Sequence, residues 1–144
     1  KIYHLLILNN HEQNRINKEK WIEIIRGIGE KVVVTSTPED VAMANEICQE
    51  TGSTFIKTSS FSDLSCIVAN VKLAVTLDGG VVHAAAALKV KVVVIAGKDN
   101  IKRWYPWGFK EYILRDSSSL AQNVKTDVIL TNIEKALSDL KGQL

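Results

Sequence analysis

The sequence predicts an α/β fold of the Rossmann-like type, a doubly wound parallel sheet of about six strands. Short apolar runs alternate with segments whose apolar residues recur at helical spacing, which is the pattern of repeated strand-helix units. The helix of each unit must cross the sheet and return right-handed, so helices are expected on both faces. The 144 residues, of which 46% are hydrophobic and 24% charged, fit a single globular domain.

The strands are expected where short runs of apolar and β-branched residues end at polar or glycine-containing loops. The first run stops at Asn9 and Asn10, and the fourth stops at Asp78, Gly79 and Gly80. By these boundaries the six predicted strands are residues 2–8, 31–35, 54–56, 73–77, 91–96 and 112–114.

The helices are expected between these strands, because apolar residues recur there every three or four positions. The first helix is expected to end at Gly27 and Gly29. Thr37 and Pro38 supply a cap and a first-position proline for the second helix. Ser60 with Asp63 three positions later is a capping signal for the third helix. The expected buried helix faces are Trp21, Ile24, Ile25 and Ile28; Val41, Ala44, Ile47 and Cys48; Leu64, Ile67, Val68 and Val71; an alanine-rich segment over residues 81–88; and Leu130, Ile133, Leu137 and Leu140.

The order of the strands predicts where a ligand binds. In the common doubly wound order 3-2-1-4-5-6, the first and fourth strands are neighbours at the point where the winding reverses, and ligands bind outside the carboxyl ends of the strands at that point. The loops that follow these two strands, residues 9–17 and 78–80, are therefore expected to form a binding crevice.

The loop Asp78-Gly79-Gly80 is the strongest local signal in this crevice. Two adjacent glycines let the backbone turn tightly and leave amide groups open at the start of a helix, where the dipole favours an anion such as phosphate. Asp78 can also cap the helix while the glycines only make the turn, and the two interpretations are compatible. His83, in the first turns of this helix, either faces the crevice or rests against the next strand.

Charged residues near the crevice allow two interpretations each. Arg15, Lys18 and Lys20 follow the first strand, where a cation could reach a diphosphate or simply be solvated. Glu39 could bind ribose hydroxyls or cap its own helix. Aromatic residues of the loop over residues 97–109 are expected to pack over the sheet edge rather than to cover a ligand: Trp104, Tyr105 and Trp107.

Several classes of function are not indicated. The formal net charge is only +2 and no run of like charge stands out, so no nucleic-acid partner is expected. The dinucleotide fingerprint, the phosphate-binding loop of nucleoside triphosphatases, the nucleophile elbow and clusters of metal ligands are absent from the sequence, so metal-independent binding is expected. No membrane span or leader is expected, and Cys48 and Cys66 are expected to be reduced core thiols, which favours the cytoplasm.

The second half of the chain resembles the glycosyltransferase family 9 heptosyltransferases. In that family the fourth strand is followed by D-[ST]-G-x-x-H, an alanine-rich helix, a strand, a glycine and, after a variable loop, a proline. Asp78, Gly80, His83, Gly97 and Pro106 match these positions in order, and the resemblance extends over nearly the whole chain. It implies that residues 1–144 are the C-terminal, nucleotide-sugar-binding half of a GT-B fold, with the N-terminal acceptor domain absent.

The resemblance also implies a role for each residue of the crevice, with an ADP-sugar as substrate and no cofactor. Asp78 would contact hydroxyls of the donor sugar, and His83 would support the donor pocket. The remaining implied contacts are the amides of Gly79, Gly80 and Val81 with the pyrophosphate, Asn9 and Asn10 near the phosphates, Glu39 at the ribose, and Thr58, Ser59 and Ser60 along the adenine.

Two positions depart from the family pattern. Gly79 stands where the family has Ser or Thr, which removes a hydroxyl that could bond a phosphate oxygen and so puts donor affinity and identity in question. The lysine expected before the Trp21 helix is displaced, so Arg15 is the first choice for the phosphate cation and Lys18 the second.

The function implied is inverting, metal-independent transfer of a heptose-like sugar from ADP to a lipopolysaccharide core acceptor. The full-length protein would be cytoplasmic and peripheral at the inner face of the inner membrane. The general base would belong to the N-terminal half, so no catalytic residue is expected in this fragment, which is expected to be inactive alone. Two alternatives stay open: a non-catalytic nucleotide-binding Rossmann-like module, and another GT-B enzyme such as a nucleotide-sugar epimerase.

Overall fold

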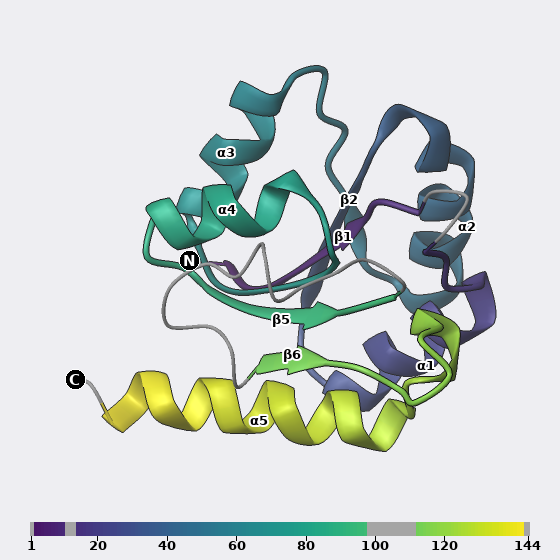
Figure 1. Cartoon of the computed structure of the whole chain (residues 1–144). Coiled ribbons are helices and arrows are strands. Elements are labelled where there is room, and N and C mark those ends of the chain that lie inside the picture. The colour runs from purple at the N-terminus through teal and green to yellow at the C-terminus, as the bar shows by residue number, and fades with distance from the viewer. Residues whose placement is uncertain (1, 11–13, 98–111, 143–144) are drawn as a thin grey trace.

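A computed structural model describes residues 2–10, 14–97 and 112–142 of the chain (Figure 1). Within these residues, six strands form one sheet in the order β3-β2-β1-β4-β5-β6, and each neighbouring pair is parallel. The predicted fold class is therefore confirmed, and the strands follow the common doubly wound order from which the binding crevice was predicted. The strands are β1 (Ile2–Leu8), β2 (Val32–Ser36), β3 (Thr54–Phe55), β4 (Val71–Leu77), β5 (Lys91–Ile95) and β6 (Ile113–Leu114).

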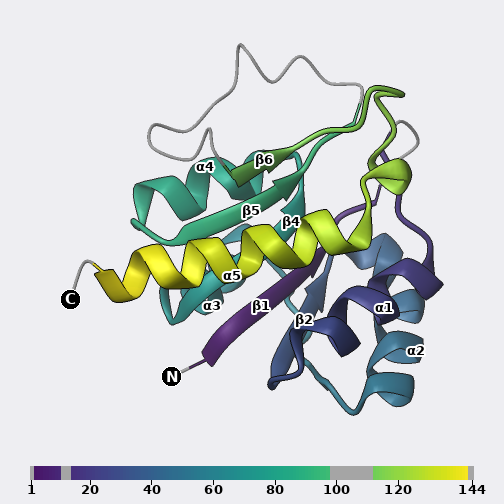
Figure 2. The same cartoon turned by 90° about the horizontal axis from the view of Figure 1, so that it is seen from below.

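Helices cover both faces of the sheet. In Figures 1 and 2, α3 and α4 lie on one face, and α1, α2 and α5 lie on the other. The helices and short 3-10 turns are α1 (Lys18–Ile28), η1 (Pro38–Asp40), α2 (Val41–Thr51), α3 (Phe61–Ala69), α4 (Gly80–Ala87), η4 (Ala121–Asn123) and α5 (Thr126–Gly142).

Two hydrophobic layers, one on each side of the sheet, follow from the alternation of side chains along the strands. In β1, Leu6 and Leu8 point into the layer under α1, α2 and α5, whereas Leu5 and Ile7 point into the layer under α3 and α4. The strands are apolar on both faces because both faces are covered. Burial of this apolar surface is the main force that holds the helices on the sheet.

The ends of α1 and α3 follow the local signals of the sequence. Before α2, Pro38 opens η1, but the Thr37 side chain that was predicted as a cap makes no capping hydrogen bond. The Asn17 side chain accepts a hydrogen bond from the Lys20 amide at 2.9 Å and caps α1. Gly29, with φ of 69°, ends the same helix in the left-handed conformation that glycine adopts without strain. The Ser60 hydroxyl accepts from the Asp63 amide at 3.1 Å, so the predicted cap of α3 is present.

Three expectations about single residues were wrong. Gly27 does not end α1, which runs on to Ile28 and packs this glycine directly against Leu130 of α5. Val71 is the first residue of β4 rather than part of the preceding helix, because it pairs with Ile2 of β1. Cys66 is exposed on α3 rather than buried in the core, and Cys48 is half-buried. The predicted aromatic cluster of residues 104–107 lies outside the described residues.

Candidate functional site

The carboxyl ends of β1, β2 and β4 border a pocket of about 400 Å³. This volume lies within the range of small-molecule sites, roughly 300–1,000 Å³. Its position is the switch point of the winding between β1 and β4, where the topology predicted a crevice. The pocket is lined by Ile7, Asn9, Ser36, Thr37, Pro38, Thr58, Ser59, Ser60, Phe61, Leu64, Gly80 and Val81.

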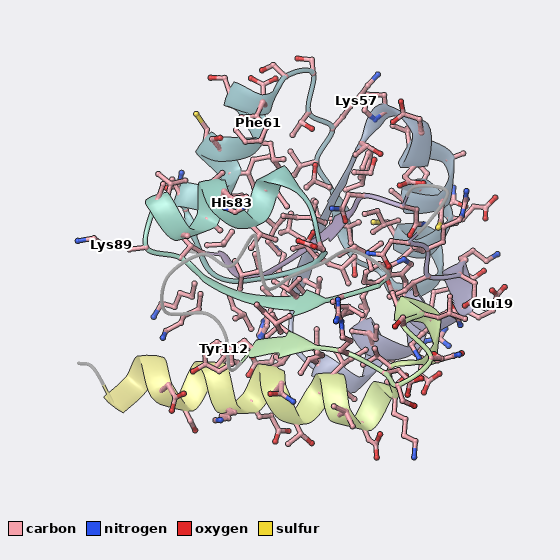
Figure 3. The ribbon with its side chains drawn as sticks, in the orientation of Figure 1. Glu19, Lys57, Phe61, His83, Lys89 and Tyr112 are labelled. Atoms are coloured by element: carbon pink, nitrogen blue, oxygen red, sulfur yellow. The ribbon has the colours of Figure 1, made fainter. Side chains whose placement is uncertain are left out.

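One wall of the pocket is apolar. Ile7 belongs to β1, Leu64 to α3 and Val81 to α4, so the wall is assembled from three elements. Phe61, the first residue of α3, also lines the pocket, although 60% of its surface is exposed. Figure 3 shows Phe61 on α3 and His83 on the neighbouring α4. A large aromatic side chain left in solvent beside a pocket offers its ring to a flat ligand group.

Several other lining residues carry hydroxyl groups. Ser36 ends β2, Thr37 follows it, and Thr58 to Ser60 precede α3. Ser36 is 6% exposed, and its Oγ has no hydrogen-bond partner among the described residues. The Ser59 hydroxyl donates to Asp63 Oδ2 at 2.7 Å, which lowers the pKa of that carboxyl together with the Ser59 amide. The pocket therefore combines an apolar slot with a hydroxyl-bearing rim.

The start of α4 forms the end of the pocket nearest β4. Gly79 is the N-cap residue, and Gly80 and Val81 line the pocket. Because Gly79 has no side chain, it cannot cap the first amides of the helix itself. Amides at a helix N-terminus favour an anion, so this end suits a phosphate group. Asp78, directly before the glycines, is half-buried.

Asn9 joins this turn to the end of β1. Its Oδ1 accepts hydrogen bonds from Thr76 Oγ1 at 3.1 Å and from the Leu77 amide at 3.2 Å. Its Nδ2 donates to the Leu77 carbonyl at 3.3 Å. A single carboxamide thus connects the two strands whose ends border the pocket.

Asn10 faces away from this pocket. Its backbone amide donates to Asp40 Oδ2 at 2.8 Å, and its side chain exchanges hydrogen bonds with the backbone of Ile16 at 3.2 and 3.0 Å. Asp40, which is buried, was not predicted as a site residue, although Thr37 and Asp40 have the three-residue spacing of a cap. Glu39 beside it is exposed and is not among the residues that line the pocket.

Arg15 and Lys18 border a separate hollow of about 530 Å³, formed with Met43 and Gln122 among others. Lys18 lies 3.4 Å from Glu46 and 3.6 Å from Glu50 of α2. A hydrogen bond to Glu46 and the charges of both carboxylates raise the pKa of Lys18. This lysine is therefore directed towards α2, whereas Arg15 is exposed.

The structure brings together only part of the predicted site. Asn9, Thr58, Ser59, Ser60, Gly80 and Val81 meet around the pocket, and Gly79 lies in the adjoining turn. His83 is exposed on α4 and does not line the pocket. Sequence reasoning missed Phe61, whose only signal was an aromatic residue directly after a helix cap, and it missed the lining residues Ile7, Ser36, Thr37, Pro38 and Leu64.

Within residues 2–10, 14–97 and 112–142, no helix is long and apolar enough to cross a bilayer. In the same part of the chain, no three His, Cys, Asp or Glu side chains gather in a way that could hold a metal ion.

Solved structures of glycosyltransferases share this fold. The Escherichia coli ADP-heptose lipopolysaccharide heptosyltransferase II superposes with a TM-score of 0.80 at 16% identity, over 97% of this chain and 48% of that one. The E. coli heptosyltransferase WaaC, solved with ADP-2-deoxy-2-fluoro heptose, gives a TM-score of 0.78 at 18% identity, over 93% and 43% of the two chains. The chain thus spans slightly less than half the length of these enzymes.

A more distant structural likeness is to the UDP-GlcNAc 2-epimerase of Methanocaldococcus jannaschii, with a TM-score of 0.62 at 19% identity, over 94% of this chain and 38% of that one. No curated protein sequence matches the chain. At these identities, the structural likenesses establish the fold alone, which is that of one half of the GT-B glycosyltransferases.

The sequence profile of glycosyltransferase family 9 (heptosyltransferase) matches residues 12–133, which is most of the chain and includes the Asp78-Gly79-Gly80 turn. The parallel sheet, the pocket at its switch point and this match together place the chain in glycosyltransferase family 9.

Proposed function

We propose that this chain is the donor-binding domain of a glycosyltransferase that transfers a heptose-like sugar from an ADP-sugar to a lipopolysaccharide core acceptor. The observation that carries the proposal is the pocket at the switch point, which combines an apolar slot, hydroxyl groups and a helix N-terminus. These three surfaces match the three parts of a nucleoside diphosphate: a flat base, a ribose and a charged diphosphate.

The base would lie between Phe61 and the segment from Thr58 to Ser60. Phe61 is already exposed, so covering its ring with a base removes apolar surface from water at little conformational cost. The orphaned Ser36 hydroxyl would gain a partner from a ligand hydroxyl after a small adjustment of the rim.

The diphosphate would lie against the start of α4. The amides of Gly79, Gly80 and Val81 would donate to phosphate oxygens, and the helix dipole would favour the negative charge. Asp78 would bind hydroxyls of the donor sugar, and His83 would support that end of the pocket from the next turn of α4. Arg15 is the proposed cation for the phosphates, because Lys18 is engaged by two carboxylates. Its exposed side chain borders the separate hollow, so it would have to turn towards the pocket when the donor binds.

The acceptor would be bound by a part of the enzyme outside this chain, which would also supply the general base. Transfer requires donor, acceptor and base to be held together, so the domain alone would bind the donor without turning it over. The reaction is proposed to invert the anomeric centre without a metal or other cofactor, in the cytoplasm and next to the inner membrane.

The melting temperature of the chain tests donor binding. ADP, and more strongly an ADP-sugar, should raise it, because a ligand that binds only the folded state stabilises that state. Asp78→Ala and Gly80→Val should each remove most of this shift. If neither ADP nor an ADP-sugar at millimolar concentration produces heat in calorimetry, the proposal is wrong. A response to UDP-GlcNAc alone would favour an epimerase-like enzyme.

Magnesium and a chelator test the metal-independent assignment. ADP should bind equally well in the presence of EDTA and of magnesium. Loss of binding with EDTA would show that a cation bridges the diphosphate and the protein.

A further inference from the structure

The turn after β4 is held by one side chain from another strand. Asn9, directly after β1, uses both polar atoms of its carboxamide on the last two residues of β4. Thr76, which donates to it, is buried, but its hydroxyl also lies 3.0 Å from the Leu77 carbonyl and could donate there instead. Leu77 is buried as well, so removing the carboxamide would take away the side-chain acceptor of its amide.

Gly79 is constrained by this same side chain. A Cβ built on Gly79 would lie 3.1 Å from Asn9 Nδ2, closer than ordinary van der Waals contact. The backbone of Gly79, with φ of 167°, is extended and accessible to any residue, so its conformation does not require glycine. Gly80 provides a contrast, because a Cβ there would meet nothing within 4 Å. A side chain at position 79 would therefore require the Asn9 carboxamide to move by a few tenths of an ångström.

We propose that Asn9 is the positioning residue of the Asp78-Gly79-Gly80 turn, and that Asn9 and Gly79 form a matched pair. Asn9 holds the turn so that the first amides of α4 face the pocket, and glycine at 79 leaves room for the carboxamide. The role in ligand binding rests on the proposed function, whereas the packing of the pair does not.

The Asn9–Gly79 pair is sensitive to substitution, because a hydrogen bond of Asn9 tolerates little displacement of the carboxamide. The Nδ2 to Leu77 bond is 3.3 Å long, near the upper limit for an N–H···O bond. A side chain at position 79 must displace the carboxamide by a few tenths of an ångström, and a shift away from the Leu77 carbonyl breaks this bond. The turn, and the amides that follow it, then lose their fixed position.

A double-mutant cycle tests the matched pair in the absence of ligand. Gly79→Ser in the natural background should lower the urea midpoint of unfolding. The same change in an Asn9→Ser background should lower it much less, because the shorter side chain leaves room. Gly80→Ala is the matched control for folding and should not lower the midpoint. Additive effects of the two substitutions would overturn the inference.

ADP affinity, measured by calorimetry on the same variants, tests the positioning role. Gly79→Ser should weaken ADP binding about tenfold when Asn9 is present, which is the effect of losing roughly one hydrogen bond. In the Asn9→Ser background, the same change should weaken ADP binding by less than about threefold.

The isosteric change Asn9→Asp separates positioning from general damage to the fold. Its carboxylate keeps the acceptor for Thr76 and Leu77 but places an oxygen against the Leu77 carbonyl. It also brings a negative charge to the pocket, which disfavours the phosphates as well. ADP binding should weaken by about tenfold, while adenosine, which lacks the phosphates, should lose less than about threefold. Equal losses for both ligands would contradict a positioning role. If the natural chain binds no ADP but the unfolding cycle shows coupling, the proposed function is wrong and the matched pair stands.

Discussion

Replacing Phe61 by alanine separates ligand binding from stability more cleanly than any other change at the pocket. With 60% of its surface exposed, the ring contributes little to the core, and alanine at this position preserves the helical backbone of α3. We therefore expect the free energy of unfolding without ligand to change by no more than about 0.5 kcal/mol. An aromatic stacking contact is worth about 0.5–1.5 kcal/mol beyond the area that it buries.

With the additional loss of buried apolar area, Phe61→Ala should cost about 1–2 kcal/mol of binding free energy, or about 5- to 30-fold in Kd for ADP. Adenosine should be weakened by a similar factor, because the lost contact is with the base. This pattern is opposite to the one expected for Asn9→Asp, which acts on the phosphates. Calorimetry with both ligands measures the two factors directly.

Leu88→Ala is the matched control for Phe61→Ala. Leu88 is also a large, partly exposed apolar residue, at the end of α4, but it does not line the pocket. Its replacement should leave ADP affinity unchanged. If Phe61→Ala binds ADP and adenosine as tightly as the natural chain does, the base does not lie on this ring and the proposed orientation of the nucleotide is wrong.

Two further predictions concern charge. Burial lowers the pKa of His4 below 6.5. Under mildly acidic conditions, His4 therefore takes up a proton more readily in the unfolded chain than in the folded chain. The free energy of unfolding should be highest above pH 6.5 and fall as the pH is lowered towards the folded-state pKa of His4. Urea unfolding at several pH values measures this dependence. His4→Gln should make the free energy of unfolding depend less on pH. Arg15→Ala should weaken ADP binding about three- to tenfold, whereas Lys18→Ala should not, because Lys18 is paired with Glu46. If calorimetry shows a larger loss for Lys18→Ala than for Arg15→Ala, Lys18 is the phosphate cation instead.

The sheet could be predicted because its signals are local. Alternating apolar runs, the Ser60 cap and the glycine after α1 are properties of a few neighbouring residues, and they led to the six observed strands. The same local reasoning failed at Val71, whose spacing continued the pattern of the preceding helix. Its place in β4 depends on pairing with Ile2, which local spacing does not reveal.

The candidate site could be predicted only in part, because polar side chains take their direction from distant partners. Asn9 and Asn10 are adjacent and identical, yet Asn9 bonds to Leu77, 68 positions away, while the Asn10 amide bonds to Asp40. Lys18 turns to α2 because Glu46 and Glu50 lie there. Neither choice is visible in the local sequence.

By itself, then, the sequence determined the class of fold, the turn at Asp78-Gly79-Gly80 and the edge of the sheet where the pocket lies, because burial of apolar residues follows local periodicity. The tertiary structure decided which polar groups reach that edge, left Phe61 exposed beside the pocket and placed the Asn9 carboxamide close to position 79. These features depend on the space and the hydrogen-bond partners that remain once the helices have packed on the sheet.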